Sequence, residues 1–379
     1  MLGEMLRDFC ALYNAGLEER IDAYRKCGIS RSYKDQALEL KAVRAVGCGH
    51  ERWSFSAQQQ VLRRLDKAFK AFFRRCKAGE KAGFPRFRAS ARYHAAEFRV
   101  GDGLTLRNSG RIGIVGIAGE IKCKWHRALP SEPASAILTR QNGKWHVVFH
   151  VEVEMAQATP SATVGIDVGL TALVALPNGE TLPRPNFTKK AAKGLRKRAR
   201  ALARCKKGSK RRHKIRLRKA KYETHVANKR RDYLHKLSTN LVNRFGGIGV
   251  EDLNIKGLAR GMHAKHVNDA SWAQLISMSD YKAAKAGGAV IKVDPRGTTP
   301  TCSECGQLIA KTLADRIHVC DCGCVLDRDV NSARVVHLRA FGFQARNVPS
   351  RKWTGAGLGA LSTGSGSRLA PEAACGSWR

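Results

Sequence analysis

Two kinds of reactive side chain stand close together near the end of the sequence. Cys302 and Cys305 form a Cys-x-x-Cys pair, and three more cysteines follow at 320, 322 and 324. Cysteine pairs separated by about fifteen residues are typical of a zinc ribbon, a small fold that closes around one tetrahedral ion. The other seven cysteines are scattered singly. A clustered set in a reducing cytosol therefore indicates metal binding rather than a disulfide scaffold.

Carboxylates supply the second chemistry. Asp327 and Asp329 precede apolar residues at helical spacing, which predicts a helix with acids in its first turn. Asp167 lies inside an apolar strand-like run, and Glu251 ends another such run. A carboxylate in an apolar strand is costly unless it is compensated, either by a divalent cation or by backbone amides. The acids Asp167, Glu251 and Asp329 thus come from three separated elements of one predicted α/β unit.

The predicted elements that position these acids are strands and helices that alternate along the chain. Residues 163–176 predict two strands around Gly169, and residues 245–258 predict a strand that delivers Glu251. A helical pattern, the strand AVIKV, the cysteine segment and the helix with Asp329 come next. The cysteine segment is therefore predicted as an insertion just before one of the acids.

The N-terminal part predicts helices followed by a small β domain. In the clearest helix, over 56–75, Gln59 and Arg63 lie on the polar face. This face is either simply solvated or able to contact base edges, because Gln pairs with adenine and Arg with guanine. Short alternating segments from 96 to 157, with a hairpin signal at Asn142-Gly143, predict an antiparallel barrel or sandwich.

The charge of the chain points to a polyanionic partner. The sequence has 69 Lys and Arg against 31 Asp and Glu, a net charge of +38, and nucleic acid is the simplest explanation. No apolar run near 18 residues and no signal-peptide pattern is visible, so we expect a cytosolic protein without a membrane partner. Residues 189–236 hold 22 Lys or Arg. They divide at Lys207-Gly208-Ser209 into two predicted helices that could follow a phosphate backbone.

The motifs VGIDVGL, KKGSKRRHK, VEDLNIKGL, CSECG and CGCVLDRDVNSAR occur in this order, after QQVLRRLDKAFKAFF and GFPRF. In this order they resemble the TnpB family, RNA-guided DNA nucleases of bacterial insertion sequences that are related to compact type V CRISPR effectors. The resemblance implies a multidomain α+β fold. Its parts are a helical recognition region, a small antiparallel β wedge barrel, and a RuvC nuclease domain of the RNase H-like α/β type with a zinc-ribbon insertion. The expected segments are recognition region 1–95, wedge domain 96–160, RuvC domain 161–297, zinc ribbon 298–326, last RuvC part 327–345 and disordered tail 346–379.

The resemblance also implies roles for individual residues. The catalytic acids would be Asp167, Glu251 and Asp329, which would hold two Mg²⁺ ions for phosphodiester cleavage, while Asp327 fits a helix N-cap. One structural Zn²⁺ would be bound by Cys302, Cys305, Cys320 and Cys322, with Cys324 as a substitute because the second pair is Cys-x-Cys. Nucleic-acid contacts are expected from Gln59, Arg63, Lys206, Lys207, Lys210, Arg211, Arg212 and Arg328.

The expected assembly is a monomeric ribonucleoprotein of guide RNA and target DNA in the bacterial cytoplasm, with no membrane and no small-molecule substrate. The intact acids favour an endonuclease that cuts next to a short flanking motif. Two alternatives stay open. One is an RNA-guided DNA-binding repressor that does not cleave. The other is an impaired product of an N-terminally truncated element, because the family usually opens with a strand before the first helix and this sequence starts inside that helix.

Overall fold

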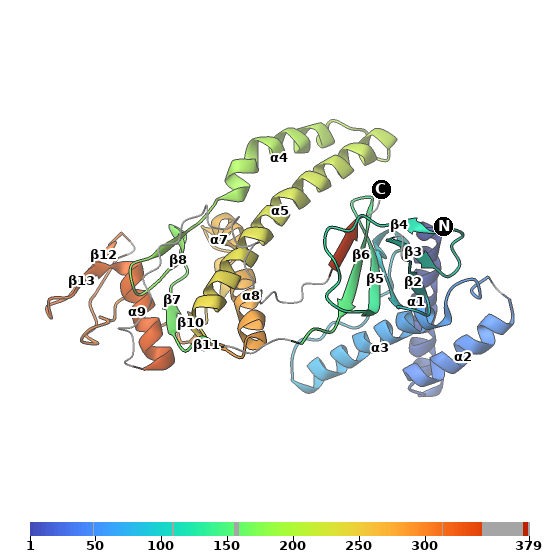
Figure 1. Cartoon of the computed structure of the whole chain (residues 1–379), viewed down its shortest axis with the longest axis horizontal. Helices are drawn as coiled ribbons and strands as arrows, with labels where there is room; N and C mark the ends of the chain where they lie inside the picture. The colour runs from blue at the N-terminus through green and yellow to red at the C-terminus, as the bar shows by residue number, and fades with distance from the viewer. Residues whose placement is uncertain (48, 108–109, 155–158, 313, 343–373, 378–379) are drawn as a thin grey trace. The chain divides into compact units, whose positions relative to one another are not determined.

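A computed structural model describes residues 1–47, 49–107, 110–154, 159–312, 314–342 and 374–377, and the chain divides into two compact units (Figure 1). The first unit comprises Met1–Glu154 with Pro371–Arg379, and the second comprises Met155–Ala370. No helix in the described ranges has the length and apolar composition needed to cross a bilayer.

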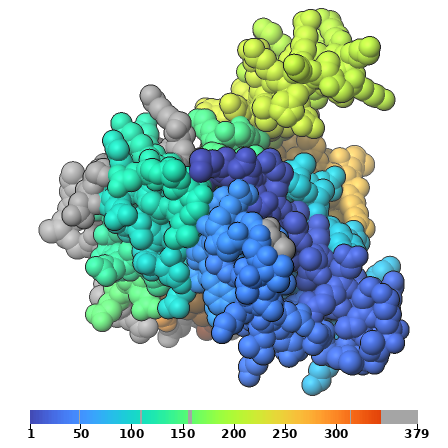
Figure 2. All heavy atoms as spheres, turned by 90° about the vertical axis from the view of Figure 1, so that its right-hand side faces the viewer, coloured from blue at the N-terminus to red at the C-terminus, as the bar shows by residue number. Residues whose placement is uncertain are grey.

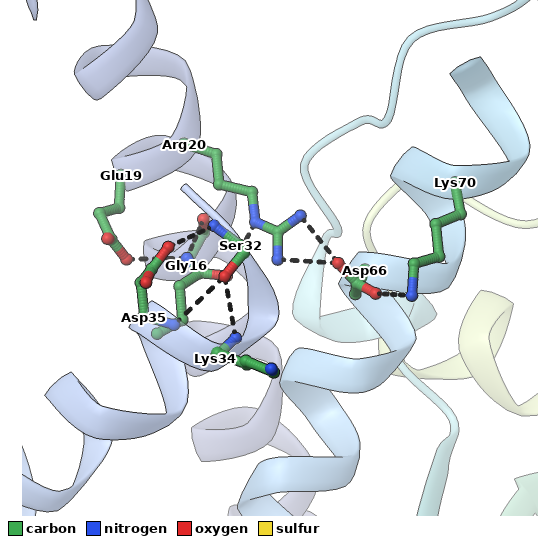
Figure 3. A network of polar contacts seen from close by, with 9 residues as sticks. Gly16, Glu19, Arg20, Ser32, Lys34, Asp35, Asp66 and Lys70 are labelled. Carbon is green, nitrogen blue, oxygen red and sulfur yellow. Dashed lines mark hydrogen bonds and ion pairs between the residues drawn. The ribbon is translucent and has the colours of Figure 1, made fainter. Parts of the chain in front are cut away.

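Three helices open the first unit: α1 (Leu2–Cys27), α2 (Tyr33–Ala45) and α3 (Phe55–Lys77), followed by a 3₁₀ turn, η1 (Ser90–Arg92). α1 ends at Gly28 in the left-handed conformation, and Ser32 caps α2, so a short turn separates the two helices. A polar network ties the helices together (Figure 3). In it, Arg20 of α1 is only 8% exposed, and its guanidinium lies 3.3 Å from a carboxylate oxygen of Asp66 in α3.

Two antiparallel sheets complete the first unit. One has the order β1 (Ala95–Arg99), β5 (Pro133–Gln141), β6 (Lys144–Val151) and β14 (Ala374–Ser377); the other has β2 (Leu104–Leu106), β3 (Arg111–Ile114) and β4 (Ile121–Lys122). Asn142 and Gly143 join β5 to β6 with φ of 51° and 79°, which confirms the predicted hairpin. The predicted disordered tail lies outside the described residues except for β14, which pairs with β6 as a strand.

The helices and strands of the first unit share one hydrophobic core. Phe9 of α1, Trp53, Phe98 of β1 and Phe149 of β6 belong to a single buried cluster. The ring centroids of Phe9 lie 6.5 Å from those of both Trp53 and Phe98. The predicted division at residues 95 and 96 therefore runs through a common core.

A three-stranded parallel sheet forms the centre of the second unit, in the order β11 (Ala289–Val293), β10 (Gly247–Glu251) and β7 (Thr163–Ile166). All five residues of β10 are buried, as expected for a central strand. The antiparallel hairpin of β8 (Ala172–Ala175) and β9 (Thr181–Pro183) continues the layer, since an antiparallel bridge joins Ala175 to Asp167 just beyond β7. The strands predicted from the apolar runs are thus confirmed.

Helices flank this sheet. They are α4 (Phe187–Ala203), α5 (Lys210–Arg244), α6 (Ile255–Leu258), α7 (Ala264–Ala270), α8 (Trp272–Lys285) and α9 (Arg328–Phe341). α4 and α5 form the predicted basic hairpin, and Ser209 caps α5 by accepting from the amide of Arg212. The buried residues of α5 lie between Val226 and Val242, so its basic N-terminal half projects from the layer it packs against (Figure 1).

Residues 298–327 lie between β11 and α9 along the chain, and we call this segment the ribbon because it contains a two-stranded hairpin. Its strands are β12 (Ile317–Val319) and β13 (Val325–Asp327), which pair antiparallel. Asn331 of α9 is fully buried and holds the preceding loop: its Nδ2 donates to Thr301 O at 2.8 Å, and its Oδ1 accepts from Ser303 N at 3.0 Å. The ribbon is therefore fastened to the helix that carries Asp329.

Candidate active site and cysteine cluster

Asp167 and Glu251 lie at the same edge of the parallel sheet. The register pairs Gly249 with Gly165 and Val250 with Ile166, so Glu251 and Asp167 are the next residues on the two neighbouring strands. Parallel strands lie about 4.8 Å apart, and their carboxyl ends meet at one edge. The sheet therefore brings two of the predicted acids together, from positions 84 residues apart in the sequence (251 minus 167).

The backbone of Asp167 is fixed by β8. Its amide donates to Ala175 O at 3.1 Å, and its carbonyl accepts from Ala175 N at 2.9 Å. Burial raises the pKa of the Asp167 carboxyl to about 8, and the negative charges of Glu251 and Asp329 add to this rise. A carboxyl in this position resists ionisation until a cation compensates it.

Glu251 is 8% exposed, and burial raises its pKa. The hydroxyl of Thr298, itself 2% exposed, donates to Glu251 Oε1 and counteracts the rise. Thr298 was not predicted from the sequence, because no spacing pattern links it to a glutamate 47 residues earlier. It fixes the orientation of the Glu251 carboxylate.

Asp329 lies in the first turn of α9. Asp327 is the N-cap, as predicted, because its Oδ1 accepts from the amides of Asp329 at 2.9 Å and Val330 at 3.2 Å. Arg328 Nη2 lies 3.2 Å from Asp329 Oδ1, and Arg328 Nη1 donates to Asp315 O at 3.1 Å. The guanidinium predicted to contact phosphate is thus directed in this structure to the neighbouring acid.

The third acid also approaches the edge of the sheet. A Cβ built at Gly169, two residues after Asp167, would lie 3.8 Å from Asp329 Oδ2. Asp167, Glu251 and Asp329 do not each offer an oxygen within 4.8 Å of the others; among the described residues, that spacing is met by two sets of side chains in the cysteine segment. A two-ion site tolerates a wider arrangement, because ligand oxygens about 2.1 Å from ions about 3.8 Å apart span up to about 8 Å. Carboxylate oxygens are the donors that Mg²⁺ prefers, so these acids suit it.

The four predicted zinc ligands converge in the ribbon. Cys302, Cys305, Cys320 and Cys322 have all four sulfurs within 4.8 Å of one another. Two Sγ pairs are 3.7 Å (Cys302 to Cys322) and 3.5 Å (Cys305 to Cys320) apart. A regular tetrahedron with Zn–S bonds of about 2.3 Å needs sulfurs about 3.8 Å apart. The cluster therefore suits a structural zinc ion with four thiolates.

The thiols of the ribbon differ in how readily they ionise. Burial opposes ionisation of Cys302, yet the amides of Cys305 and Glu304 outweigh it and lower the Cys302 pKa to about 5. Burial and the charge of Cys302 raise the pKa of Cys324 to about 11. Cys324 belongs to a second set, in which its sulfur, that of Cys302 and a ring nitrogen of His318 all lie within 4.8 Å. Cys324 was predicted from the sequence as a substitute zinc ligand, whereas His318 was not predicted.

Four of the predicted hairpin residues, Lys206, Lys207, Lys210 and Arg211, are exposed where α4 and α5 meet. In Figure 2 the hairpin, coloured yellow-green, forms a projection of the surface. Arg212 differs, since its Nη1 donates to the carbonyls of Leu202 at 2.9 Å and Cys205 at 3.1 Å. Its guanidinium thus satisfies the C-terminal end of α4 and closes the hairpin.

Gln59 and Arg63 lie one turn apart on α3, in the first unit. Arg63 is exposed, and its Nε donates to the hydroxyl of Tyr33 at 3.0 Å, with its guanidinium carbon 5.2 Å from the centroid of that ring. Gln59 is partly exposed. Tyr33 therefore holds the orientation of Arg63 on an open face.

Two sequence families match the second unit and the strand before it. The family described as "Probable transposase", OrfB_IS605, matches residues 146–262, which include Asp167 and Glu251. The family described as "Cas12f1-like, TNB domain" matches residues 272–336, which include the cysteine cluster and Asp329.

Similar proteins cover more of the chain. A Streptomyces pristinaespiralis protein named "Putative RNA-guided DNA endonuclease" is 35% identical over 73% of this chain and 69% of that protein. An Escherichia coli (strain K12) protein, "Putative RNA-guided DNA endonuclease InsQ", is 29% identical over 66% of this chain and 65% of that protein. The fold resembles that of a protein chain in the structure titled "Cryo-EM structure of the Cas12f1-sgRNA-target DNA complex", with a TM-score of 0.58 and 14% sequence identity. The match covers 89% of this chain and 82% of that chain.

Proposed function

The chain belongs to the TnpB family, and from this premise we propose that it is an RNA-guided DNA endonuclease that cuts target DNA next to a short flanking motif. Guide RNA and target DNA would be its partners, in keeping with the net charge of +38. The observation that carries the proposal is the parallel register of β7 and β10. It puts Asp167 and Glu251 at one edge of the sheet, beside the start of the helix that bears Asp329.

The proposed chemistry is RuvC-type hydrolysis of a phosphodiester bond. Asp167, Glu251 and Asp329 would hold two Mg²⁺ ions, which when bound supply an activated water and stabilise the leaving oxygen. The surrounding residues prepare the acids for this task. Thr298 orients Glu251, Asp327 fixes the first turn of α9, and Arg328 lies against Asp329 and can move to a phosphate once cations neutralise that acid.

The recognition part of the proposal assigns the exposed hairpin residues to the RNA or DNA backbone and Gln59 with Arg63 to the flanking motif. Lys206, Lys207, Lys210 and Arg211 form a positive surface suited to phosphates. Tyr33 restrains Arg63, which lowers the entropy lost when its guanidinium binds a base edge.

The test is cleavage of a target plasmid by the full chain with its guide RNA and Mg²⁺. Each of Asp167→Asn, Glu251→Gln and Asp329→Asn should reduce the cleavage rate by more than about 100-fold, since each removes several kcal/mol of transition-state stabilisation. Asp252→Asn is the matched control, because this exposed acid neighbours Glu251 and pairs with Lys292 at 3.2 Å. Its rate should stay near that of the wild type.

Normal cutting by the Asp329→Asn variant would refute the assignment of the site. Binding of the target without cutting, by the wild-type complex in Mg²⁺, would instead identify an RNA-guided repressor. A filter-binding or gel-shift measurement beside the cleavage assay separates these outcomes.

A further inference from the structure

Four phenylalanine rings gather where α3 ends. Phe69, Phe72 and Phe73 lie towards the C-terminal end of that helix, and Phe84 comes from the loop that follows it. The ring centroids of Phe84 and Phe69 are 5.5 Å apart, and those of Phe84 and Phe72 are 5.3 Å apart, both in edge-to-face geometry. The ring of Phe73 lies 5.2 Å from that of Phe72. Helix and loop thus hold the rings in one cluster.

Much of this cluster is open to solvent. Phe69 is buried in the core of the first unit, whereas Phe73 is 59% exposed and Phe84 is 47% exposed. Phe87, three residues further along the same loop, is 56% exposed. We call Phe73, Phe84 and Phe87 the aromatic surface. Apolar side chains that gather on a surface, rather than standing singly, mark a site of interaction.

The loop that carries Phe84 and Phe87 is fixed to α1. Arg88 N donates to Asn14 Oδ1 at 2.8 Å, and Asn14 Nδ2 donates to Arg88 O at 2.9 Å. The sulfhydryl of Cys10 donates to the same carbonyl at 3.2 Å. Rings that are held in place before a ligand arrives lose little conformational entropy on binding.

Cations surround the rings. Residues 69–88 contain seven Lys or Arg and one acid, Glu80. Lys70 pairs with Asp66, whereas the other six are exposed and make no ion pair within the ranges that the structure describes: Arg74, Arg75, Lys77, Lys81, Arg86 and Arg88. Three of these six follow the end of α3, so the helix dipole does not account for them. The charge therefore favours a polyanion beside the rings.

We propose that the aromatic surface stacks on unpaired bases of a single-stranded RNA segment, while the neighbouring cations contact its phosphates. This inference rests on the proposed function, in which guide RNA is the resident partner. An aromatic ring stacks on a base whose face is free, and in a duplex the neighbouring bases cover those faces. The strand is RNA rather than displaced DNA, because exposed rings need a cover throughout the life of the complex and target DNA is bound only during cleavage.

Ultraviolet cross-linking tests this inference on the full chain with its copurified RNA. Irradiation joins a base to a side chain that lies against it, and mass spectrometry of the digested protein identifies both partners. We expect ribonucleotide adducts on peptides that contain Phe73, Phe84 or Phe87. The proposal is overturned if these peptides carry no adduct while other peptides do. It is also overturned if they carry only deoxynucleotide adducts in a complex assembled with target DNA.

Fluorescence anisotropy gives a second test, with a labelled single-stranded oligouridine and an RNA duplex as probes. High salt is used, because it weakens phosphate contacts and leaves stacking in place. Phe73→Leu combined with Phe87→Leu keeps apolar side chains and removes two rings. We expect this double variant to bind the single strand at least about 10-fold more weakly than wild type, and the duplex equally well.

Tyr24→Leu is the matched control, because Tyr24 is a 68% exposed ring on α1 that also stands beside cations, Arg25 and Lys26. Its affinity for the single strand should equal that of wild type. Equal affinity of the double variant and wild type for the single strand overturns the proposal. Equal losses for single strand and duplex overturn it as well, since stacking on free bases cannot produce them.

The two proposals can fail separately. A wild-type complex that cleaves its target but carries no ribonucleotide adduct on the aromatic surface overturns this inference alone. A wild-type complex that carries the adduct and does not cleave supports RNA binding at these rings and contradicts the endonuclease proposal.

Discussion

Gly165 and Gly249 are directly paired across the parallel strands β7 and β10. Each stands two residues before a proposed catalytic acid, and residues two apart in a strand face the same side. The helix α9 packs on that side, since a Cβ at Gly165 would lie 2.3 Å from His337 N and one at Gly249 would lie 2.8 Å from Ala340 Cβ. The absence of two side chains therefore lets α9, the helix that carries Asp329, lie against both acid-bearing strands.

Gly165→Ala should displace α9. We expect a large loss of cleavage rate and only a moderate loss in the free energy of unfolding. The added Cβ would also lie 2.4 Å from Ala333 O, and because these neighbours are backbone atoms of α9, no flexible side chain can move aside. Overpacking of this kind costs about 1–3 kcal/mol. Chemical denaturation and plasmid cleavage measure the two effects. Gly261→Ala, whose Cβ would meet only Leu258 O at 3.6 Å, is the control, and equal behaviour of the two variants would contradict this explanation.

The raised pKa of Asp167 predicts a pH dependence of stability in Mg²⁺-free buffer. The folded pKa is about 8 against an ordinary value of 3.8, so the folded state binds the proton more tightly than the unfolded state does. Stability is then highest at low pH and falls as pH rises from about 4 to about 8. The melting temperature without Mg²⁺ should thus be lower at pH 8 than at pH 6, and added Mg²⁺ should restore it.

Asp167→Asn isolates this effect, because it keeps the shape of the side chain and removes the charge. The variant should melt higher than wild type at pH 8 without Mg²⁺, and its response to added Mg²⁺ should be smaller. A wild-type melting temperature that does not change between pH 6 and pH 8, or a variant that is less stable at pH 8, would argue against a buried, repelled carboxylate at this position.

The parts of the site that the sequence could predict are those fixed by local pattern. Asp167 can be recognised in the sequence as an acid within a strand, because the residues around it form a short and otherwise apolar segment. The break at Gly208 is visible because glycine interrupts a helical pattern, and the structure has φ of 84° there. Cysteine spacing likewise indicated the four thiols that converge.

The parts that could not be predicted depend on contacts between distant residues. Thr298 reaches Glu251 only because the turn after β11 lies beside the end of β10. His318 approaches Cys302 and Cys324 only because the ribbon folds back on itself. Arg212 looked like one more cation in a basic run, yet packing of α5 on α4 commits it to helix carbonyls.

The hairpin residues predict the salt dependence of RNA binding. Replacing Lys206, Lys207, Lys210 and Arg211 together by glutamine removes four exposed charges. If all four contact single-stranded RNA phosphates, the slope of log K against log salt should become shallower by about 2.8, at about 0.7 for each contact. Fluorescence anisotropy over a range of salt concentrations measures this slope. An unchanged slope would show that the hairpin tip does not contact the backbone.

The network in Figure 3 predicts unequal effects for two cations that share Asp66. Arg20→Ala should destabilise the first unit by about 1–3 kcal/mol, because it removes the buried partner of Asp66 and leaves Gln36 Oε1 without its donor. Lys70→Ala should cost less than about 1 kcal/mol, since its side chain is 79% exposed. Urea denaturation of both variants tests this, and similar losses would contradict the difference in burial.

Asn331 should link the cysteine cluster to catalysis without binding metal itself. Asn331→Ala leaves Ser303 N and Thr301 O without their partner, at a cost of about 1–3 kcal/mol. Because Asn331 lies two residues after Asp329 in α9, loss of these bonds should let the ribbon and the first turn of the helix move apart. We expect slower plasmid cleavage with an unchanged zinc content, while Asn268→Ala, on the exposed side of α7, changes neither. A variant that loses zinc along with activity would instead show that Asn331 supports the cluster alone, and full activity would show that α9 positions Asp329 without help from the ribbon.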